Sequence, residues 1–277
     1  MEAVNLLNEN QNIQRPQIWH YGLVARAHVE LWTAIGPEAA YYKNLIETSG
    51  QPALDLGCGG GRLLLFMLKA GLDVDGCDFS EDMLAVCQEQ AAKHSLSPRL
   101  YAQAIHELDL PRRYKTIFAC GVIGLGGNPR LTMQAMQRCY EHLRPGGTFA
   151  FNYAVRWNEP GAWLARLPEY RRAEPGEWPV SSERQPLADG TELELASRTL
   201  KTDPLENVAI RQLRARLWQE GVLIKEEVHT QVVEDFTKNE LVLMLERAGF
   251  SDIRICGDFS DEPATADHKD LIFICRK

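Results

Sequence analysis

Four glycines in five residues (57–61) separate two apolar runs in the stretch ALDLGCGGGRLLLFM, residues 53–67. The first run has the length of a buried strand, and the second has the length of a helix. Glycine adopts backbone conformations that other residues avoid, and it lets a ligand approach the main chain closely. The stretch therefore predicts a strand, a tight turn and a helix whose N-terminal N–H groups hold a ligand.

Strand-like and helical segments alternate through the first 153 residues. Two helices are predicted before the glycine turn, at residues 19–32 and 37–50, and three after it, at residues 62–71, 80–96 and 128–147. Strands are predicted at residues 52–57, 72–78, 98–104, 114–124 and 148–155. This alternation indicates an α/β fold with a parallel sheet covered by helices on both faces.

The composition changes after residue 153. Residues 156–179 are rich in Pro, Trp and Arg, and three segments with strand-like alternation follow around the turn signals Asp189-Gly190 and Glu220-Gly221. These segments predict a small inserted antiparallel sheet. The α/β pattern then resumes with a helix capped by Thr237 and ended by Gly249, and with two final strands.

We therefore expect three parts. Residues 1–153 hold the N-terminal helices and the main α/β core. Residues 154–235 form the inserted sheet and a flap, and residues 236–277 complete the core. The layout predicts that the inserted sheet lies over the carboxyl ends of the core strands, where ligands bind in open α/β folds.

Composition limits the class of protein. The 277 residues are 45% hydrophobic and 25% charged, which is ordinary for a soluble globular protein. Neither a signal peptide nor an apolar run of about 18 residues is present, so no membrane association is expected. The seven scattered cysteines lack a C-x-x-C pair and favour reduced thiols in the cytoplasm, with no metal site. The net charge of −8 argues against a long nucleic acid as a partner.

The dinucleotide fingerprint G-x-G-x-x-G is the obvious alternative for the glycine turn. Counted from Gly57, its third position is Arg62 rather than glycine, and Asp55 stands two residues before the turn. A carboxylate there suits a ligand's amine better than a pyrophosphate. A nicotinamide-dependent oxidoreductase is therefore disfavoured, while a cofactor-binding protein without catalysis stays open as an alternative.

Three landmarks in order resemble the class I S-adenosylmethionine-dependent methyltransferases. LDLGCGGGR is similar to their first motif, D/E-x-G-x-G-x-G; VDGCDFSEDML places an acid 17 residues after the last glycine of that motif; and LRPGGTFAF resembles the turn into the fifth strand. The resemblance covers about 100 residues. It implies a Rossmann-like, seven-stranded, mostly parallel sheet, S-adenosylmethionine as the cofactor, and methyl transfer as the reaction.

The resemblance also implies a set of cofactor contacts. Asp78 would hold the ribose, and Phe79 and Met83 would pack against adenine. Many family members place an acid after the third strand for the adenine amino group, and this chain has none there. Adenine would instead meet backbone groups in that stretch or the side chain of Gln103. Tyr21, favoured over Tyr41 and Tyr42, would cap the methionine end, and Arg26 or Arg62 would meet the methionine carboxylate. The full set is Tyr21, Arg26, Asp55, Gly57, Cys58, Gly59, Gly61, Arg62, Asp78, Phe79, Met83, Gln103, Ala104, Ile105, Cys120 and Gly121.

The acceptor is expected to be a small molecule. The fourth strand ends in CGVIGLGG, not in the N/D-P-P-Y/F of enzymes that methylate amino groups in DNA. The inserted sheet resembles, in layout only, that of sugar amino-methyltransferases and other natural-product enzymes. We expect transfer to an N or O atom. The sequence does not choose a general base among His20, His28, His106 and His229.

The Trp- and Arg-rich segment is open to three interpretations. It can contact the acceptor, form a partly exposed flap, or supply the anchors of a homodimer contact. Its members are Arg156, Trp157, Trp163, Arg166, Arg171, Arg172 and Trp178.

Overall fold

The computed structural model describes residues 20–31, 34–155, 160–171, 176–179 and 183–277. Predictions that fall on Trp19, Trp32, Arg156, Trp157 and Arg172 lie outside these residues.

The main sheet has seven strands in the order β10-β11-β5-β4-β1-β2-β3. Its strands are β1 (Ala53–Leu56), β2 (Val74–Asp78), β3 (Leu100–Ala102), β4 (Tyr114–Ala119), β5 (Leu143–Ala154), β10 (Ser251–Gly257) and β11 (Asp270–Arg276). β11 is antiparallel to both β5 and β10, and the pairs from β5 to β3 are all parallel. The predicted Rossmann-like, mostly parallel sheet is confirmed.

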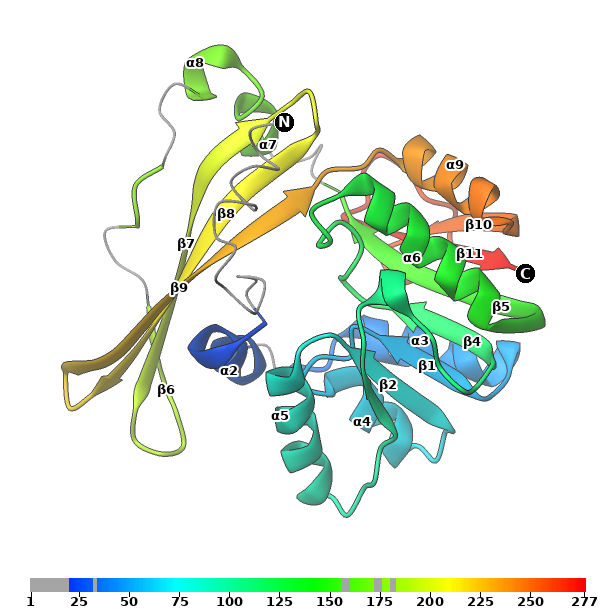
Figure 1. Ribbon diagram of the computed structural model, residues 1–277, viewed down its shortest axis with the longest axis horizontal. Helices are drawn as coiled ribbons and strands as arrows, with labels where there is room; N and C mark the ends of the chain where they lie inside the picture. Colours follow the sequence, from blue (N-terminus) through cyan, green and yellow to red (C-terminus); the bar gives the residue numbers. More distant parts are fainter. Residues whose placement is uncertain (1–19, 32–33, 156–159, 172–175, 180–182) are drawn as a thin grey trace.

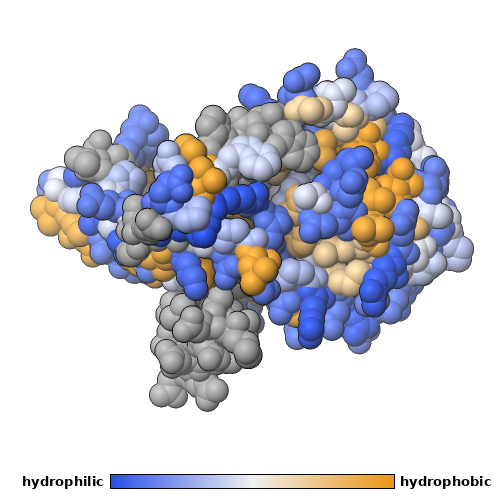
Figure 2. All heavy atoms as spheres, turned by 90° about the horizontal axis from the view of Figure 1, so that it is seen from above, coloured by the Kyte–Doolittle hydropathy of each residue, from blue (hydrophilic) through white to orange (hydrophobic). Residues whose placement is uncertain are grey.

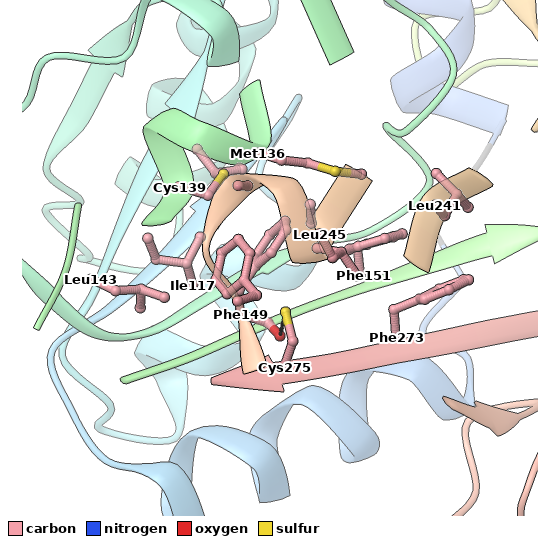
Figure 3. Close-up of a cluster of buried hydrophobic side chains, with 14 of the residues drawn as sticks. Ile117, Met136, Cys139, Leu143, Phe149, Phe151, Leu241, Leu245, Phe273 and Cys275 are labelled. Atoms are coloured by element: carbon pink, nitrogen blue, oxygen red, sulfur yellow. Dashed lines mark hydrogen bonds between the residues drawn. The ribbon is translucent and has the colours of Figure 1, made fainter. Parts of the chain in front are cut away.

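Helices cover both faces of this sheet (Figure 1). They are α3 (Pro37–Ser49), α4 (Arg62–Lys69), α5 (Glu81–Ala92), α6 (Pro129–His142) and α9 (Lys238–Ala248), with a 3-10 turn η1 at Ile105–Glu107. On one face α6 and α9 bury apolar side chains against Phe149, Phe151 and Phe273 (Figure 3). On the other face α3, α4 and α5 bury a second apolar cluster against alternate residues of the same strands.

Local capping explains where several helices begin and end. The Ser80 hydroxyl accepts a hydrogen bond from the backbone N–H of Met83 and so caps α5. Thr237 and Glu240 form a reciprocal capping box at the start of α9, and Gly249 ends that helix with a left-handed backbone. The predicted boundaries at Thr237 and Gly249 are confirmed.

The inserted segment forms a second sheet, with strands in the order β6-β7-β8-β9 and all pairs antiparallel. Its strands are β6 (Arg184–Pro186), β7 (Glu192–Asp203), β8 (Val208–Gln219) and β9 (Val222–Glu234), and the short helices α7 (Pro160–Leu164) and α8 (Pro168–Arg171) precede them. The Asp189-Gly190 and Glu220-Gly221 turns lie where the sequence predicts them. The sequence missed β6, which is only three residues long and lies at the edge of the sheet.

The helix α2 (Gly22–Leu31) joins the two sheets. Its Leu23, Val24 and Ala27 pack against apolar side chains of β7 and β8. The Gly22 N–H donates to Asp82 Oδ2 at 2.8 Å, at the start of α5. The N-terminal helix therefore packs on the inserted sheet, although the sequence predicts it as part of the main core.

Seen from above, the inserted sheet is the narrower part of the molecule, and hydrophilic and hydrophobic residues are interspersed over both parts (Figure 2). Within the described residues, no helix combines the length and the apolar character that crossing a membrane requires.

Candidate active site

A cavity of about 1810 Å³ lies at the carboxyl ends of the central strands. The glycine turn between β1 and α4 forms part of its wall. Residues at the ends of β2, β3 and β4 form another part, and α2, α6 and the inserted sheet complete it. The location agrees with the position at which open α/β sheets bind ligands.

The glycines of the turn have two different roles. Gly57, Gly59 and Gly61 all have left-handed backbones, with φ values of 68°, 51° and 87°. A Cβ atom at Gly57 would lie 2.4 Å from Val122 Cγ1, and one at Gly61 would lie 2.5 Å from Cys87 Sγ. A Cβ at Gly59 would meet nothing within 4 Å. Packing inside the protein thus accounts for Gly57 and Gly61, whereas Gly59 faces open space in the cavity.

Asp78 ties the turn to the end of β2. It is 5% exposed, and its two carboxylate oxygens accept hydrogen bonds from the N–H groups of Gly59 and Ser80, each at 2.9 Å. Burial raises the pKa of Asp78, and the two N–H donors act in the opposite direction. The carboxylate therefore lies beside the turn, and two donors stabilise its charged form.

Asp55 is a buried acid of the cavity with one unpaired oxygen atom. It is 2% exposed, and its Oδ2 atom is buried with no hydrogen-bond partner among the described residues. Burial raises its pKa to about 8, although the nearby charge of Arg62 acts to lower it. A buried carboxylate oxygen without a donor is costly, and a ligand's amine would supply the missing donor.

Residues 53–147 match the family model described as a methyltransferase domain. These residues form a methyltransferase domain. A protein of Geobacillus sp. (strain WCH70) that is named as a methyltransferase is 30% identical to this chain over 139 residues. These residues are 48% of this chain and 54% of that protein. The ubiquinone biosynthesis O-methyltransferase of Pseudomonas entomophila is 29% identical over 125 residues, which are 44% of this chain and 51% of the relative. The chain thus spans about half the length of these curated relatives.

Solved methyltransferases share the fold over nearly the whole chain. The CcbJ methyltransferase from Streptomyces caelestis has a TM-score of 0.64 at 23% identity and covers 88% of this chain and 96% of its own. The sugar N-methyltransferase KedS8 from Streptoalloteichus has a TM-score of 0.64 at 15% identity, with coverages of 87% and 88%. The resemblance stated from the sequence is confirmed, and the shared fold includes the inserted segment.

The methyltransferase domain brings most of the predicted cofactor residues to one cavity. Fifteen of the sixteen line it: Tyr21, Asp55, Gly57, Cys58, Gly59, Gly61, Arg62, Asp78, Phe79, Met83, Gln103, Ala104, Ile105, Cys120 and Gly121. Arg26 does not line the cavity, and its guanidinium lies 2.7 Å from Asp189 in the inserted sheet. Of the two arginines proposed for a ligand's carboxylate, the structure places Arg62 at the cavity.

Arg62 is held at the start of α4 by groups that the sequence analysis did not identify. It donates hydrogen bonds to Glu38 and to the Ala34 carbonyl, and Glu38 also lines the cavity. The pairing partner comes from α3, 24 residues earlier in the chain, so no local spacing could have indicated it. Because the Glu38 contact orients Arg62, the guanidinium is positioned before a ligand arrives.

An aromatic group covers the end of the cavity beside α5. The ring of Phe79 meets His20 at 5.1 Å and Tyr21 at 5.8 Å between centroids, both edge to face. The two other tyrosines lie elsewhere. Tyr42 is fully buried against Phe118, and Tyr41 packs edge to face on Phe259. Of the three tyrosines, Tyr21 alone lines the cavity.

Gln103 lines the cavity, but its side chain is engaged elsewhere. Its amide oxygen accepts a hydrogen bond from the Asp109 N–H at 2.9 Å, and its amide nitrogen donates to the Asp109 carbonyl at 3.3 Å. The predicted contact between the Gln103 side chain and a base is therefore disfavoured, and the contact through backbone groups of the stretch after β3 stays a prediction.

The lining residues that come from the later part of the chain carry no charged side chain. The described lining residues beyond position 119 are Cys120, Gly121, Val122, Ile123, Gly124, Leu125, Gly126, Gly127, Leu131, Thr132, Ala135, Leu200, Ile210, Thr230 and Val232. They belong to the loop after β4, to α6 and to the inserted sheet. All the charged lining residues come from positions 20–107. We call the lining residues of positions 20–107 the charged half of the cavity, and the lining residues beyond position 119 its uncharged or apolar half.

Three of the four histidines weighed from the sequence line the cavity: His20, His28 and His106. Burial lowers the pKa of His20 to about 3 and that of His28 to about 4. Both rings are therefore neutral at neutral pH and weak as bases. His229 is not among the lining residues, and its Nε2 lies 3.3 Å from Glu227 on the same strand.

Proposed function

We propose that the chain is an S-adenosylmethionine-dependent methyltransferase that transfers a methyl group to an N or O atom of a small-molecule acceptor. The observation that carries the proposal is the division of one cavity into a charged half around Asp55 and Asp78 and an uncharged half beneath the inserted sheet.

The charged half fits S-adenosylmethionine. The unpartnered Asp55 oxygen suits the amine of the methionine part, and Arg62 suits its carboxylate. Asp78 lies where an acid at the end of the second strand holds ribose hydroxyls, with Phe79 and Met83 beside it for the base. Gly59 leaves room for the ligand at the turn. When bound, the cofactor supplies a methyl group activated by a sulfonium.

The uncharged half suits an acceptor with a largely apolar body. An apolar wall excludes water from the reacting atoms and aligns the acceptor by shape. The solved sugar N-methyltransferase and the curated O-methyltransferase relatives act on small molecules by their printed names, which supports the same class here. Whether N or O is methylated stays a prediction, as do the cytoplasmic location and the homodimer.

Two experiments test the proposal in sequence. The thermal unfolding midpoint should rise with S-adenosylmethionine and with S-adenosylhomocysteine, and not with NAD. Transfer of labelled methyl should then be measured against a panel containing catechol, benzylamine and D-glucosamine. Stabilisation by NAD alone would support the oxidoreductase. Cofactor binding without transfer to any member of a wide panel would support a binding protein.

A further inference from the structure

Glu234, the last residue of β9, lies behind the apolar half of the cavity. It is 2% exposed. Its Oε2 atom accepts a hydrogen bond from the Thr132 hydroxyl at 2.8 Å, and its Oε1 atom is buried with no partner among the described residues. Thr132 itself lines the cavity. One oxygen of the Glu234 carboxylate therefore accepts no hydrogen bond from the described residues, and the Thr132 hydroxyl connects the other oxygen to the cavity wall.

Within the described part of the chain, no ion pair accounts for this acid. The loop of residues 121–127 carries no titratable side chain, and it meets β9 through a hydrogen bond from Glu234 N to the Gly124 carbonyl at 2.8 Å. Asp235 lies 3.3 Å from Arg166, and Arg130 of α6 is exposed. On β5, the Tyr153 hydroxyl accepts from the Phe236 N–H at 2.7 Å.

Burial raises the pKa of Glu234 to about 7, and the Thr132 hydrogen bond acts to lower it. A glutamine would accept the same hydrogen bond from Thr132 without the cost of a buried ionisable group. The structural contact between α6 and β9 alone therefore does not require an acid at this position.

We propose that Thr132 and Glu234 form the proton-accepting pair for the acceptor, with Thr132 touching the acceptor and Glu234 acting through it. This inference rests on the proposed function. As the acceptor's lone pair bonds to the methyl carbon, the electron pair of the broken carbon–sulfur bond goes to sulfur. The acceptor's proton passes to Thr132 Oγ1, and the hydroxyl's own proton passes to Glu234, which becomes neutral.

His20, His28 and Asp55, which also line the cavity, are less suited to this step. His20 and His28 are weak bases, and Asp55 belongs to the charged half. Among the described lining residues beyond position 119, the hydroxyl groups are those of Thr132 and Thr230. A carboxylate lies behind Thr132 at hydrogen-bond distance, and this places the base beside the apolar wall.

The test compares four variants in single-turnover transfer from labelled S-adenosylmethionine to catechol, benzylamine and D-glucosamine. Glu234→Gln keeps the hydrogen bond from Thr132 but cannot take a proton. It should lower the rate by about 100-fold at pH 8 and abolish the rise in rate between about pH 6 and 8. Thr132→Val should behave alike, and Thr132→Ser should recover most of the rate. Asp235→Asn, a neighbouring acid outside the pair, should keep the wild-type pH profile.

Two results would overturn the pair. One is a Glu234→Gln variant with the wild-type rate and pH profile. The other is a loss of rate that is fully explained by weaker cofactor binding and a lower unfolding midpoint. The hydrogen bond between Thr132 and Glu234 would then serve only to join α6 to β9.

A second readout needs no turnover. The carboxyl absorption of Glu234, taken as the infrared difference between wild type and Glu234→Gln with S-adenosylhomocysteine bound, should show ionisation near pH 7. A carboxyl still protonated at pH 9 could accept no proton, and the pair would be excluded. If no panel compound is methylated, the transfer assay contradicts the proposed function. The infrared titration still decides whether Glu234 can accept a proton.

Discussion

The two halves of the cavity are built by different means. The charged half is assembled from residues 20–107, chiefly at the ends of strands β1 to β3. Its two buried acids are Asp78, which accepts hydrogen bonds from two backbone N–H groups, and Asp55, whose Oδ2 atom has no partner among the described residues. The uncharged half is assembled from the loop after β4, from α6 and from a sheet inserted much later in the chain. In the proposed function, the first half holds the cofactor through specific polar contacts, and the second selects the acceptor by its shape.

The largest test of this division is Gly59→Val. A side chain there would enter the open space beside the turn, on a backbone with φ of 51°. We expect cofactor affinity to fall by more than about 100-fold, measured by calorimetry, since the branched side chain would occupy the ligand's place. The matched control is Gly71→Val, where φ is 79° and the surroundings are equally open but lie outside the cavity. If both variants lose the cofactor equally, backbone strain rather than the cavity explains the result.

Asp78→Ala should have the next largest effect. It removes the proposed ribose contact and also the acceptor of the Gly59 and Ser80 N–H groups. We expect about a ten- to a hundredfold loss of cofactor affinity, since charge-assisted hydrogen bonds contribute about 1.5–3 kcal/mol. Unchanged calorimetric affinity in this variant would contradict the placement of the ribose.

Asp55 predicts a pH dependence. Its folded pKa of about 8 lies above the ordinary value of 3.8, so the free protein holds a proton there at pH 7. Because a ligand's ammonium pairs with the ionised form, affinity for S-adenosylmethionine should rise with pH between about 6 and 8, by at most about tenfold per unit. Asp55→Asn should bind weakly and with little dependence on pH over this range. A wild-type affinity that is flat over the same range would count against the amine contact.

The raised pKa of Asp55 also makes the stability of the folded protein depend on pH. A proton is bound at Asp55 in the folded state and absent in the unfolded state between about pH 4 and pH 8, so this group makes the protein less stable as pH rises through that window. The proposed site therefore costs stability in the absence of its ligand.

Ile210→Asp tests the other half. Ile210 lies on β8 opposite Val232 of β9, and both line the cavity. A carboxylate in this apolar wall should raise the acceptor's KM by about tenfold or more and leave the cofactor's dissociation constant unchanged. Leu205→Asp, at a residue that is 90% exposed beyond β7, serves as the control. A weaker affinity for the cofactor in Ile210→Asp would show that the two halves are not separable.

The sequence predicts those structural features that are set by residues close together in the chain, and it does not predict contacts between distant residues. The glycine turn before α4 and the Thr237 cap of α9 are set by residues a few positions apart, and they lie where the sequence predicts them. The packing of α2 on β7 and β8 joins residues about 170 to 190 positions apart, as Leu23 and Leu193 do, and amphipathic spacing says nothing about which sheet the helix covers.

Site residues follow the same distinction. Asp55 and Asp78 belong to motifs with fixed spacing. Glu38 and Glu234 acquire their places only through tertiary contacts, with Arg62 and Thr132 respectively, and isolated acids in a helix or at a strand end carry no recognisable signal. Arg26 is one of the two arginines predicted to meet the methionine carboxylate, but it pairs with Asp189 outside the cavity. Its place in the sequence does not reveal this tertiary contact.

The smallest effect is expected from the tryptophans of the inserted segment. Trp178 lies between the guanidinium groups of Arg198 and Arg214, at 4.6 and 4.4 Å from the ring centroid, and Trp163 is 55% exposed with Arg166 at 5.8 Å. Neither lines the cavity. Trp178→Ala should therefore lower the unfolding midpoint, since two cation–π contacts are lost, and change the acceptor's KM by less than about twofold. Trp163→Ala should change neither quantity measurably. Sedimentation of both variants and the wild type tests whether the Trp- and Arg-rich segment forms a subunit contact. If Trp163→Ala dissociates an oligomer, the segment is such a contact. A large rise in the acceptor's KM in either variant would instead extend the uncharged half of the cavity to this segment.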